Sequence, residues 1–320
     1  MRGRVVLRST LHAVGTLLFV VIFNFFLFRV VPGDPVTRIA RSEGLTLEQR
    51  EALAAEYGLD KPMLAQLPGY IGSMLTLDFG NSFGSGRPVT NEIGERIGKT
   101  ALLVGVSTIG SIAIGLVLGV YGAWKRGSAL DTGSMTTSLL LYSVPEGWLS
   151  LVLLMVFGAI LGIFPIGGYR STSDLTGFAY VTDVLNHLVL PAFALMIAYV
   201  GQYALMMRAS LLDVMGEEYL DLARAKGIRE EHVLWRHAVP NAILPIFTLI
   251  FYSFGYIVGG AVVVESIFSW PGLGNLTYKA IASQDFPVLQ AAFLLTSASV
   301  IFFNLLADLL YGYLDPRVRR

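Results

Sequence analysis

The chain has 320 residues, of which 54% are hydrophobic and only 14% are charged, and its formal net charge at pH 7 is zero. A soluble globular protein carries about 25% charged residues, so this deficit indicates a chain that is largely surrounded by lipid. The balanced charge gives no indication of a nucleic-acid partner. There are no cysteines, which excludes disulfides and thiolate metal sites.

Six apolar runs are long enough to cross a bilayer, which takes about 20 mostly apolar residues. The first run follows three arginines, but it is too long for a signal peptide and is not followed by a small-residue cleavage site, so we expect it to be retained. The sequence therefore predicts an all-α membrane protein with six transmembrane helices. The expected spans are residues 10–31, 100–123, 136–161, 186–207, 243–264 and 287–311.

The distribution of Lys and Arg predicts the orientation of these spans. If the N-terminus is inside, the inner segments carry most of the basic residues, whereas the two short outer loops carry only Arg170 and Lys279. Short cytoplasmic loops are enriched in Lys and Arg, while long loops follow this rule weakly. Both termini are therefore predicted to be cytoplasmic.

The expected spans divide the chain into three parts. An N-terminal tail with the first span is followed by an outer segment and then by a membrane core that contains a polar cytoplasmic loop. These parts are residues 1–31, residues 32–99 and residues 100–320, and the polar loop is residues 208–242.

The outer segment has helical patterns of its own. Thr46 and Gln49 have the spacing of a capping box ahead of a helix expected at residues 47–57. A second, partly apolar helix is expected at residues 63–77. Gly80, Gly84 and Gly86 then mark a turn region.

A short polar helix is expected within the cytoplasmic loop. Glu217 and Glu218 lie at its start, and Arg224 and Lys226 lie at its end, so both pairs of charges suit the helix dipole. Gly227 follows, and glycine readily adopts the left-handed conformation that ends a helix.

One face of this helix is apolar. Leu220, Ala223 and the stem of Arg224 are three and four residues apart, so they form a small contact surface. A second helix is expected to extend to Pro240. This arrangement can dock onto a soluble partner, but a solvated loop whose charges only fix the topology fits equally well.

Three motifs occur in order along this loop, namely Glu218-Tyr219, Ala223-Arg224-Ala225-Lys226-Gly227 and Asn241-Ala242-Ile243-Leu244-Pro245. Together they resemble the EAA loop of bacterial ABC importer permeases, and in particular of the dipeptide, oligopeptide and nickel importers. The general motif has a Glu six residues before its glycine, where this chain has Asp221. The charge is therefore kept on a shorter side chain.

The resemblance extends over nearly the whole chain. Further motifs that are similar to those of the family occur in the expected order, and they look closer to the first permease of the pair than to the second. They are Arg29–Pro35, Gly58–Pro62, Ser85–Val89, Ser143–Pro145, His187–Pro191, Glu265–Gly274 and Asp308–Arg317.

The resemblance implies a type I ABC importer permease fold in a bacterial inner or plasma membrane. It implies that a second, related permease subunit packs beside this chain and that the translocation pathway lies between the two. Two separate ATPase subunits would bind ATP and Mg, and an extracytoplasmic binding protein would deliver the substrate. This chain would then be a transport subunit with no catalytic residue and no cofactor of its own.

The resemblance also assigns the docking of the ATPase to the cytoplasmic helix. Ala223 would permit close approach, Gly227 would supply the turn, and Asp221 would pair with a basic group of the ATPase. We expect Gly227→Asp to abolish transport while membrane insertion stays intact. The docking residues are Glu218, Tyr219, Asp221, Ala223, Arg224, Ala225, Lys226 and Gly227.

Other functional classes lack their motifs. The sequence contains no Gly-x-x-x-x-Gly-Lys-Ser/Thr phosphate loop, no His-Glu-x-x-His metal motif and no Gly-x-Ser-x-Gly elbow. An ATP-independent secondary transporter would explain six spans but not the cytoplasmic motif, and no internal repeats are visible. Peptides are the expected substrates, with nickel or another small solute as the alternative.

Polar residues in or near the spans are candidates for the pathway, because such residues are unfavourable in lipid. Glu146 follows Pro145, where a kink can free backbone groups, and Gln202 lies in the fourth expected span. We regard Glu146 and Gln202 as possible pathway residues. Gly115 and Gly119 have the small-xxx-small spacing that favours close packing of helices.

Overall fold

The computed structural model describes residues 2–30, 62–171, 174–257, 259 and 261–314, and all extended secondary structure in these ranges is helical. The helix expected at residues 47–57 lies outside the described residues. The elements are α1 (Arg2–Val30), α4 (Met63–Leu75), α5 (Val89–Trp124), α6 (Ala129–Ser143), α7 (Glu146–Leu153), η1 (Leu154–Ile160), α8 (Gly177–Met215), α9 (Glu218–Ala225), α10 (Glu230–Val233), η2 (Leu234–Ala238), α11 (Val239–Ala242), α12 (Leu244–Gly255), α13 (Val262–Ile267), α14 (Leu273–Ser283) and α15 (Phe286–Leu314), where η marks a π-helix.

Four of the described helices, α1, α5, α8 and α15, are each long and apolar enough to cross a membrane. Two further spans are bent pairs. Helix α6 and the α7–η1 helix meet at 95°, and the helix from α10 to α11 meets α12 at 50°. The described residues therefore contain four spans, or six if each bent pair is counted as one, which agrees with the all-α prediction.

The expected span at residues 136–161 is not a straight helix. Pro145 precedes α7, and the residue before it, Val144, has extended backbone angles of φ −78° and ψ 125°. A residue that precedes proline is disfavoured in the α conformation, so the helix stops at Ser143. The apolar run continues through this break, which explains why hydropathy alone predicted one helix.

The expected span at residues 243–264 is also interrupted. Helix α12 has 12 residues, or about 18 Å of length, which is well short of the roughly 30 Å of a hydrocarbon core. The helical segment before it continues beyond Pro240, where we expected it to stop, as far as Ala242. The chain after α12 becomes irregular before α13 begins at Val262.

Two helices are longer than their apolar runs. Helix α5 begins at Val89, so residues 89–99, which we assigned to the outer segment, form its first turns. Helix α8 covers Gly177–Met215, whereas the expected span was 186–207. Hydropathy detects only the apolar stretch along a helix, so it does not detect polar turns at either end. The outer helix α4 agrees with the prediction of a helix at residues 63–77.

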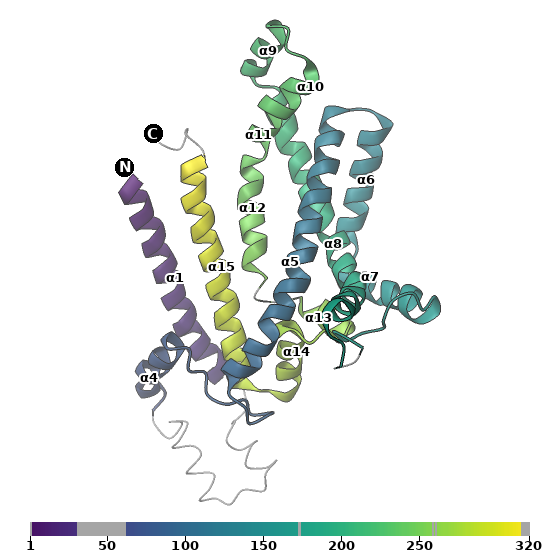
Figure 1. Ribbon diagram of the computed structural model, residues 1–320. Helices are drawn as coiled ribbons and strands as arrows, with labels where there is room; N and C mark the ends of the chain where they lie inside the picture. The colour runs from purple at the N-terminus through teal and green to yellow at the C-terminus, as the bar shows by residue number, and fades with distance from the viewer. Residues whose placement is uncertain (1, 31–61, 172–173, 258, 260, 315–320) are drawn as a thin grey trace, which may run out of the picture.

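The long helices form a bundle with two different ends (Figure 1). Helix α5 packs against α8, α6 packs against α8, α12 packs against α15, and α15 packs against α1. At one end, α9 and α10 project beyond the other helices, and the start of α1 and the end of α15 lie toward this same end. Helices α4, α13 and α14 lie at the opposite end.

Glycines on α5 allow its close contact with α8. A Cβ atom at Gly115 would lie 2.6 Å from the Cβ of Tyr203, and one at Gly119 would lie 2.6 Å from the carbonyl oxygen of Ala204. Real Cβ atoms essentially never approach so closely, so these positions exclude larger side chains. The predicted role of Gly115 and Gly119 in close helix packing is confirmed.

Two buried carboxylates hold the turns at the end opposite α9. Glu265 accepts hydrogen bonds from the hydroxyl of Thr100 at 2.8 Å and from the backbone N–H of Asn275 at 3.0 Å. Asp285 accepts from the backbone N–H of Phe83 at 3.1 Å and of Gly84 at 3.0 Å. Because every donor here belongs to a distant segment or to the start of a helix, these carboxylates have a structural role.

Candidate functional site

Helix α9 has the bounds that the sequence predicted. It begins at Glu218 with Glu217 as its N-cap, and it ends at Ala225 with Lys226 as its C-cap. It forms part of the unit that projects from the end of the bundle (Figure 1). The acidic first turn and the basic last turn match the charges favoured at the two ends of a helix dipole.

Gly227 ends this helix with a φ of 77°, in the left-handed region that favours glycine. Its N–H donates to the carbonyl of Arg224 at 2.9 Å, and the N–H of Ile228 donates to the carbonyl of Ala223 at 3.3 Å. This pair of bonds is the Schellman motif. The prediction that Gly227 makes the turn is therefore confirmed.

The two faces of α9 have different environments. Leu220 is completely buried and Ala223 is 7% exposed, and both belong to a core cluster that includes Leu211 of α8 and Val233 of α10. The two residues share a face, as expected, but this face packs against their own chain. Close approach of a partner at Ala223 stays a prediction, and in this structure the residue also serves the packing of α9 on its own chain. The opposite face includes Leu222, which is 58% exposed.

The charged residues of α9 interact within the same loop. The Arg224 guanidinium donates to Asp221 at 2.8 Å and to Glu230 at 3.0 Å, which joins α9 to α10. Hydrogen bonding to Asp221 and the nearby charge of Glu230 raise the pKa of Arg224 above its ordinary value. Asp221, which we expected to pair with a partner, already has this internal partner, although it remains exposed.

Side chains also tie the loop to the bundle. The Tyr219 hydroxyl donates to the carbonyl of His237 at 3.3 Å, and the Asn241 amide donates to the same oxygen at 2.7 Å. His237 lies in the π-helix η2, where the helical hydrogen-bond pattern is altered. The Ser210 hydroxyl of α8 donates to the carbonyl of Ala242 at 2.6 Å. Helices α8 to α11 are therefore linked by polar as well as apolar contacts.

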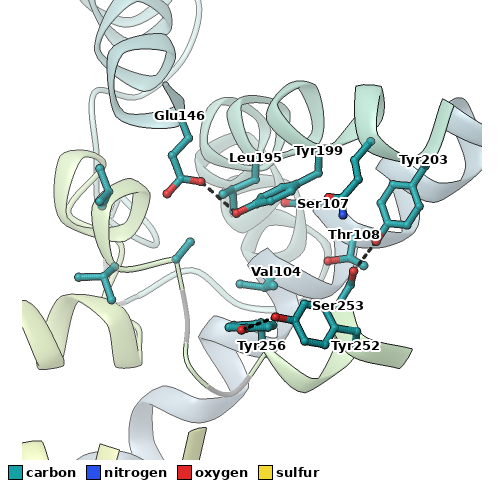
Figure 2. A pocket seen from close by; sticks show the side chains of 14 residues that line it. Val104, Ser107, Thr108, Glu146, Leu195, Tyr199, Tyr203, Tyr252, Ser253 and Tyr256 are labelled. Atoms are coloured by element: carbon teal, nitrogen blue, oxygen red, sulfur yellow. Dashed lines mark hydrogen bonds between the residues drawn. The ribbon is translucent and has the colours of Figure 1, made fainter. Parts of the chain in front are cut away.

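A cavity of about 450 Å³ lies deeper in the bundle, between α5, α8, α12 and the starts of α7 and α13 (Figure 2). This volume lies within the range of about 300–1,000 Å³ that is typical of small-molecule sites. Its walls are formed by Val104, Ser107, Thr108, Glu146, Leu195, Tyr199, Gln202, Tyr203, Tyr252, Ser253, Tyr256, Ala261, Val262 and Val263.

Polar side chains from three helices line this cavity. On α8, Tyr199 lies three and four residues before Gln202 and Tyr203, so these side chains share one face of the helix. Ser107 and Thr108 come from α5, Tyr199, Gln202 and Tyr203 from α8, and Tyr252 and Ser253 from α12, followed by its C-cap Tyr256.

Hydrogen bonds connect side chains of the cavity wall in pairs (Figure 2). A phenol hydroxyl takes part in every pair, so tyrosine dominates the polar surface. The pairs are Tyr199 Oη donating to Glu146 Oε2 at 3.2 Å, Tyr203 Oη donating to Ser253 Oγ at 2.6 Å, and the hydroxyls of Tyr252 and Tyr256 at 2.8 Å.

Both possible pathway residues, Glu146 and Gln202, line this one cavity. The tyrosines around them did not enter the sequence-based assignment. Tyr199 and Tyr252 are 44% and 43% exposed although they lie in candidate membrane-spanning helices, and Tyr256, the C-cap of α12, is 48% exposed. Polar groups are unfavourable in hydrocarbon, so this face is suited to water or protein rather than lipid. Tyrosines at helical spacing within apolar runs were the signal that we missed.

No group of three or more His, Asp or Glu side chains within the described part of the chain could hold a metal ion. Among the described residues of its wall, the cavity has a single carboxylate, and the other polar groups there are phenols, hydroxyls and an amide. This set of groups can bind polar or cationic organic molecules by hydrogen bonds and ring contacts.

Comparison with known proteins identifies the chain. Residues 112–320 match the family model described as the binding-protein-dependent transport system inner membrane component, and residues 2–104 match the model of the N-terminal region of such components. The chain belongs to this family. The sequence-based assignment to the ABC importer permeases is thereby confirmed.

Permeases with similar sequences match it from end to end. The oligopeptide transport system permease protein AppB of Bacillus subtilis (strain 168) is 37% identical over 314 residues, with 98% of each chain covered. The dipeptide transport system permease protein DppB of Escherichia coli (strain K12) is 36% identical over 332 residues, again with 98% of each chain covered.

A solved permease structure agrees with the fold. A chain of the inward-facing MetNI methionine ABC transporter superposes with a TM-score of 0.56 at 16% identity, covering 70% of this permease and 96% of that chain. At this identity the likeness shows the ABC permease fold alone. The family and the fold together support a transport role rather than an enzymatic one.

Proposed function

We propose that this chain is a permease subunit of an ATP-driven importer of di- or oligopeptides in a bacterial cell membrane. The observation that carries the proposal is the identity of 36–37% to peptide permeases over nearly the full length. In this proposal the chain forms one half of the translocation pathway, and a second, related permease subunit forms the other half.

Helix α9 is the proposed contact with an ATPase. Its position at the projecting end of the bundle supports this role (Figure 1), as does the exposed apolar side chain of Leu222. The buried side of α9 holds the helix against α8 and α10, so a push on the exposed side would move the bundle. Two separate ATPase subunits would bind ATP and Mg, and the binding protein would deliver substrate at the end that carries α13 and α14.

Two alternatives have less support. A nickel importer would favour imidazole or thiolate ligands along its path, whereas the chain has no cysteine, and no histidine is among the described residues of the cavity wall. An ATP-independent secondary transporter would leave the projecting helix α9 without a partner.

The test is affinity purification of the tagged chain in mild detergent, followed by mass spectrometry of the proteins that accompany it. We expect a second permease and an ATPase from the wild type. Gly227→Asp should lose the ATPase while the chain still inserts into the membrane. Recovery of well-folded wild-type chain alone would overturn the proposal.

A matched pair of glycine variants separates docking from simple strain. Gly127, in the turn between α5 and α6, has a φ of 78°, close to the 77° of Gly227, and a Cβ at either position meets nothing within 4 Å. Gly227→Ala and Gly127→Ala should therefore lower stability by a similar amount, about 1–2 kcal/mol. Only Gly227→Ala is expected to reduce recovery of the ATPase.

A further inference from the structure

We propose that Glu146 and the tyrosines around it form a binding subsite for the free N-terminal ammonium group of a short peptide on its way through the permease. This inference rests on the proposed function and adds the chemical feature of the substrate that the permease itself recognises.

The charge of the cavity wall favours a cationic ligand. Glu146 is the only charged side chain among the described residues that line the cavity, so the cavity favours a cation. A peptide in neutral water carries its positive charge on the α-amino group, whose pKa is about 8. A carboxylate and an ammonium group form a charge-assisted hydrogen bond, which is stronger than a bond between neutral groups.

The position of the Glu146 carboxylate leaves one of its oxygen atoms available to a ligand. Only the Oε2 atom of Glu146 has a hydrogen-bond donor among the described residues, the Tyr199 hydroxyl at 3.2 Å. Figure 2 shows the carboxylate of Glu146 on the opposite side of the cavity from Tyr252 and Tyr256. The Oε1 atom of Glu146 is therefore available to a ligand.

Aromatic rings form a large part of the cavity wall. Tyr199, Tyr203, Tyr252 and Tyr256 all line the cavity, and the rings of Tyr252 and Tyr256 are 5.0 Å apart in an edge-on arrangement. The ring beside Glu146 is that of Tyr199, whose hydroxyl donates to the carboxylate, and a cation within about 6 Å of the face of such a ring is attracted to it. Phenol rings also offer flat surfaces that tolerate different peptide side chains, which suits an importer of many peptides.

The binding affinity expected of this subsite is moderate, as transport requires. A translocation site must bind its substrate well enough to admit it and weakly enough to release it. One partly exposed carboxylate with neutral neighbours meets this condition, whereas a cage of several carboxylates would hold a cation too firmly. The cavity volume of about 450 Å³ can accept a dipeptide.

The experiment measures equilibrium binding to the purified permease–ATPase complex in the absence of its binding protein. The probes are tritiated dialanine and tritiated N-acetyl-dialanine, which differ in the charge of the N-terminus. We expect the wild type to bind dialanine about tenfold more tightly than the acetylated probe, as the loss of one charge-assisted hydrogen bond predicts. Glu146→Gln should remove this preference, and Glu146→Asp should retain most of it.

Asp78→Asn is the matched control, because Asp78 is exposed and lies outside the cavity. The side chain accepts a hydrogen bond from the N–H of Gly80 at 3.3 Å, and the asparagine oxygen can accept the same bond. This variant should show the wild-type preference. It therefore tests whether the loss of any carboxylate has the effect expected of Glu146→Gln.

Three results would overturn the subsite: equal binding of the two probes by the wild type, an unchanged preference in Glu146→Gln, or no dialanine binding at millimolar concentration. Uptake of dialanine by the reconstituted importer is measured in parallel. If uptake persists, only the subsite fails. Failure of the proposed function gives a different result: either the chain purifies without an ATPase before any probe is added, or the complete importer takes up no dialanine.

Discussion

Two leucines on α9, Leu220 and Leu222, lie in opposite environments. Leu220 is completely buried in the core cluster below α9, whereas Leu222 is 58% exposed. Residues two apart on a helix point in different directions. The buried leucine therefore holds the helix in place, while the exposed one is available to the ATPase of the proposed function.

Substitution of these two leucines should separate stability from docking. Leu220→Ala should lower the free energy of unfolding by about 2–5 kcal/mol, as expected for a buried leucine. Leu222→Ala should change it by no more than about 0.5 kcal/mol but reduce recovery of the ATPase. Thermal unfolding in detergent and affinity purification measure the two effects. If ATPase recovery followed stability in both variants, the assignment of the exposed face would be contradicted.

At the scale of elements, the packing of α5 against α8 sets the shape of the bundle. The contact is close because Gly115 and Gly119 leave no side chain between the helices. The same two helices supply much of the cavity wall, through Ser107 on α5 and Tyr199 on α8. A change in their separation would therefore change both the bundle and the cavity.

A pair of alanine substitutions on α5 tests this contact. A Cβ at Gly119 would meet Ala204 and Met207 at 2.6 Å, whereas one at Gly105 would meet nothing within 4 Å. We expect Gly119→Ala to destabilise the permease by about 1–3 kcal/mol, as overpacking does. Gly105→Ala should be neutral or stabilise by up to about 1 kcal/mol. Equal unfolding temperatures of the two variants would be inconsistent with the close contact.

For the whole molecule, the two ends of the bundle are clearly different. One end carries the projecting helices α9 and α10 together with the start of α1 and the end of α15, and the other end carries α4, α13 and α14 (Figure 1). The arginines of the first segment and of the α9 loop therefore lie at one end. This arrangement fits the predicted cytoplasmic location of both termini.

The absence of native cysteines makes the orientation straightforward to test. Lys125→Cys places one thiol between α5 and α6, and Ser85→Cys places one before α5. A membrane-impermeant maleimide should label Ser85→Cys in intact cells and Lys125→Cys only after permeabilisation. Mass spectrometry or a gel shift reads the result, and the reverse pattern would show that the topology is inverted.

The features that the sequence predicted well are those controlled by local interactions. The ends of α9 were correct because their signals are local, namely acidic residues at the start of the helix and Gly227 with a positive φ just past its end. The break at Pro145 was missed because the apolar run continues across it. The second break begins after Gly255, the last residue of α12, and glycine within an apolar run is too common to signal it.

The arrangement of the candidate sites depended on contacts that local patterns do not contain. Ala223 is buried because α10 and the end of α8 cover it, and these contacts join different segments. The cavity likewise combines Glu146, Tyr199 and Tyr252, which are far apart in the sequence. Glu146 and Gln202 were identified as polar residues of the spans, but nothing in the sequence showed that they share a cavity.

Helix α8 runs unbroken from Tyr199 in the cavity wall to Met215, just before α9, and its one proline, Pro191, lies before this stretch. The stretch is about 24 Å long at 1.5 Å per residue, and an unbroken helix of this length moves largely as one rigid element. Rotation of the projecting end through a given angle turns the tyrosine ring at the other end through nearly the same angle. In the proposed importer, this one helix would carry a movement of the ATPase contact at α9 to the wall of the cavity.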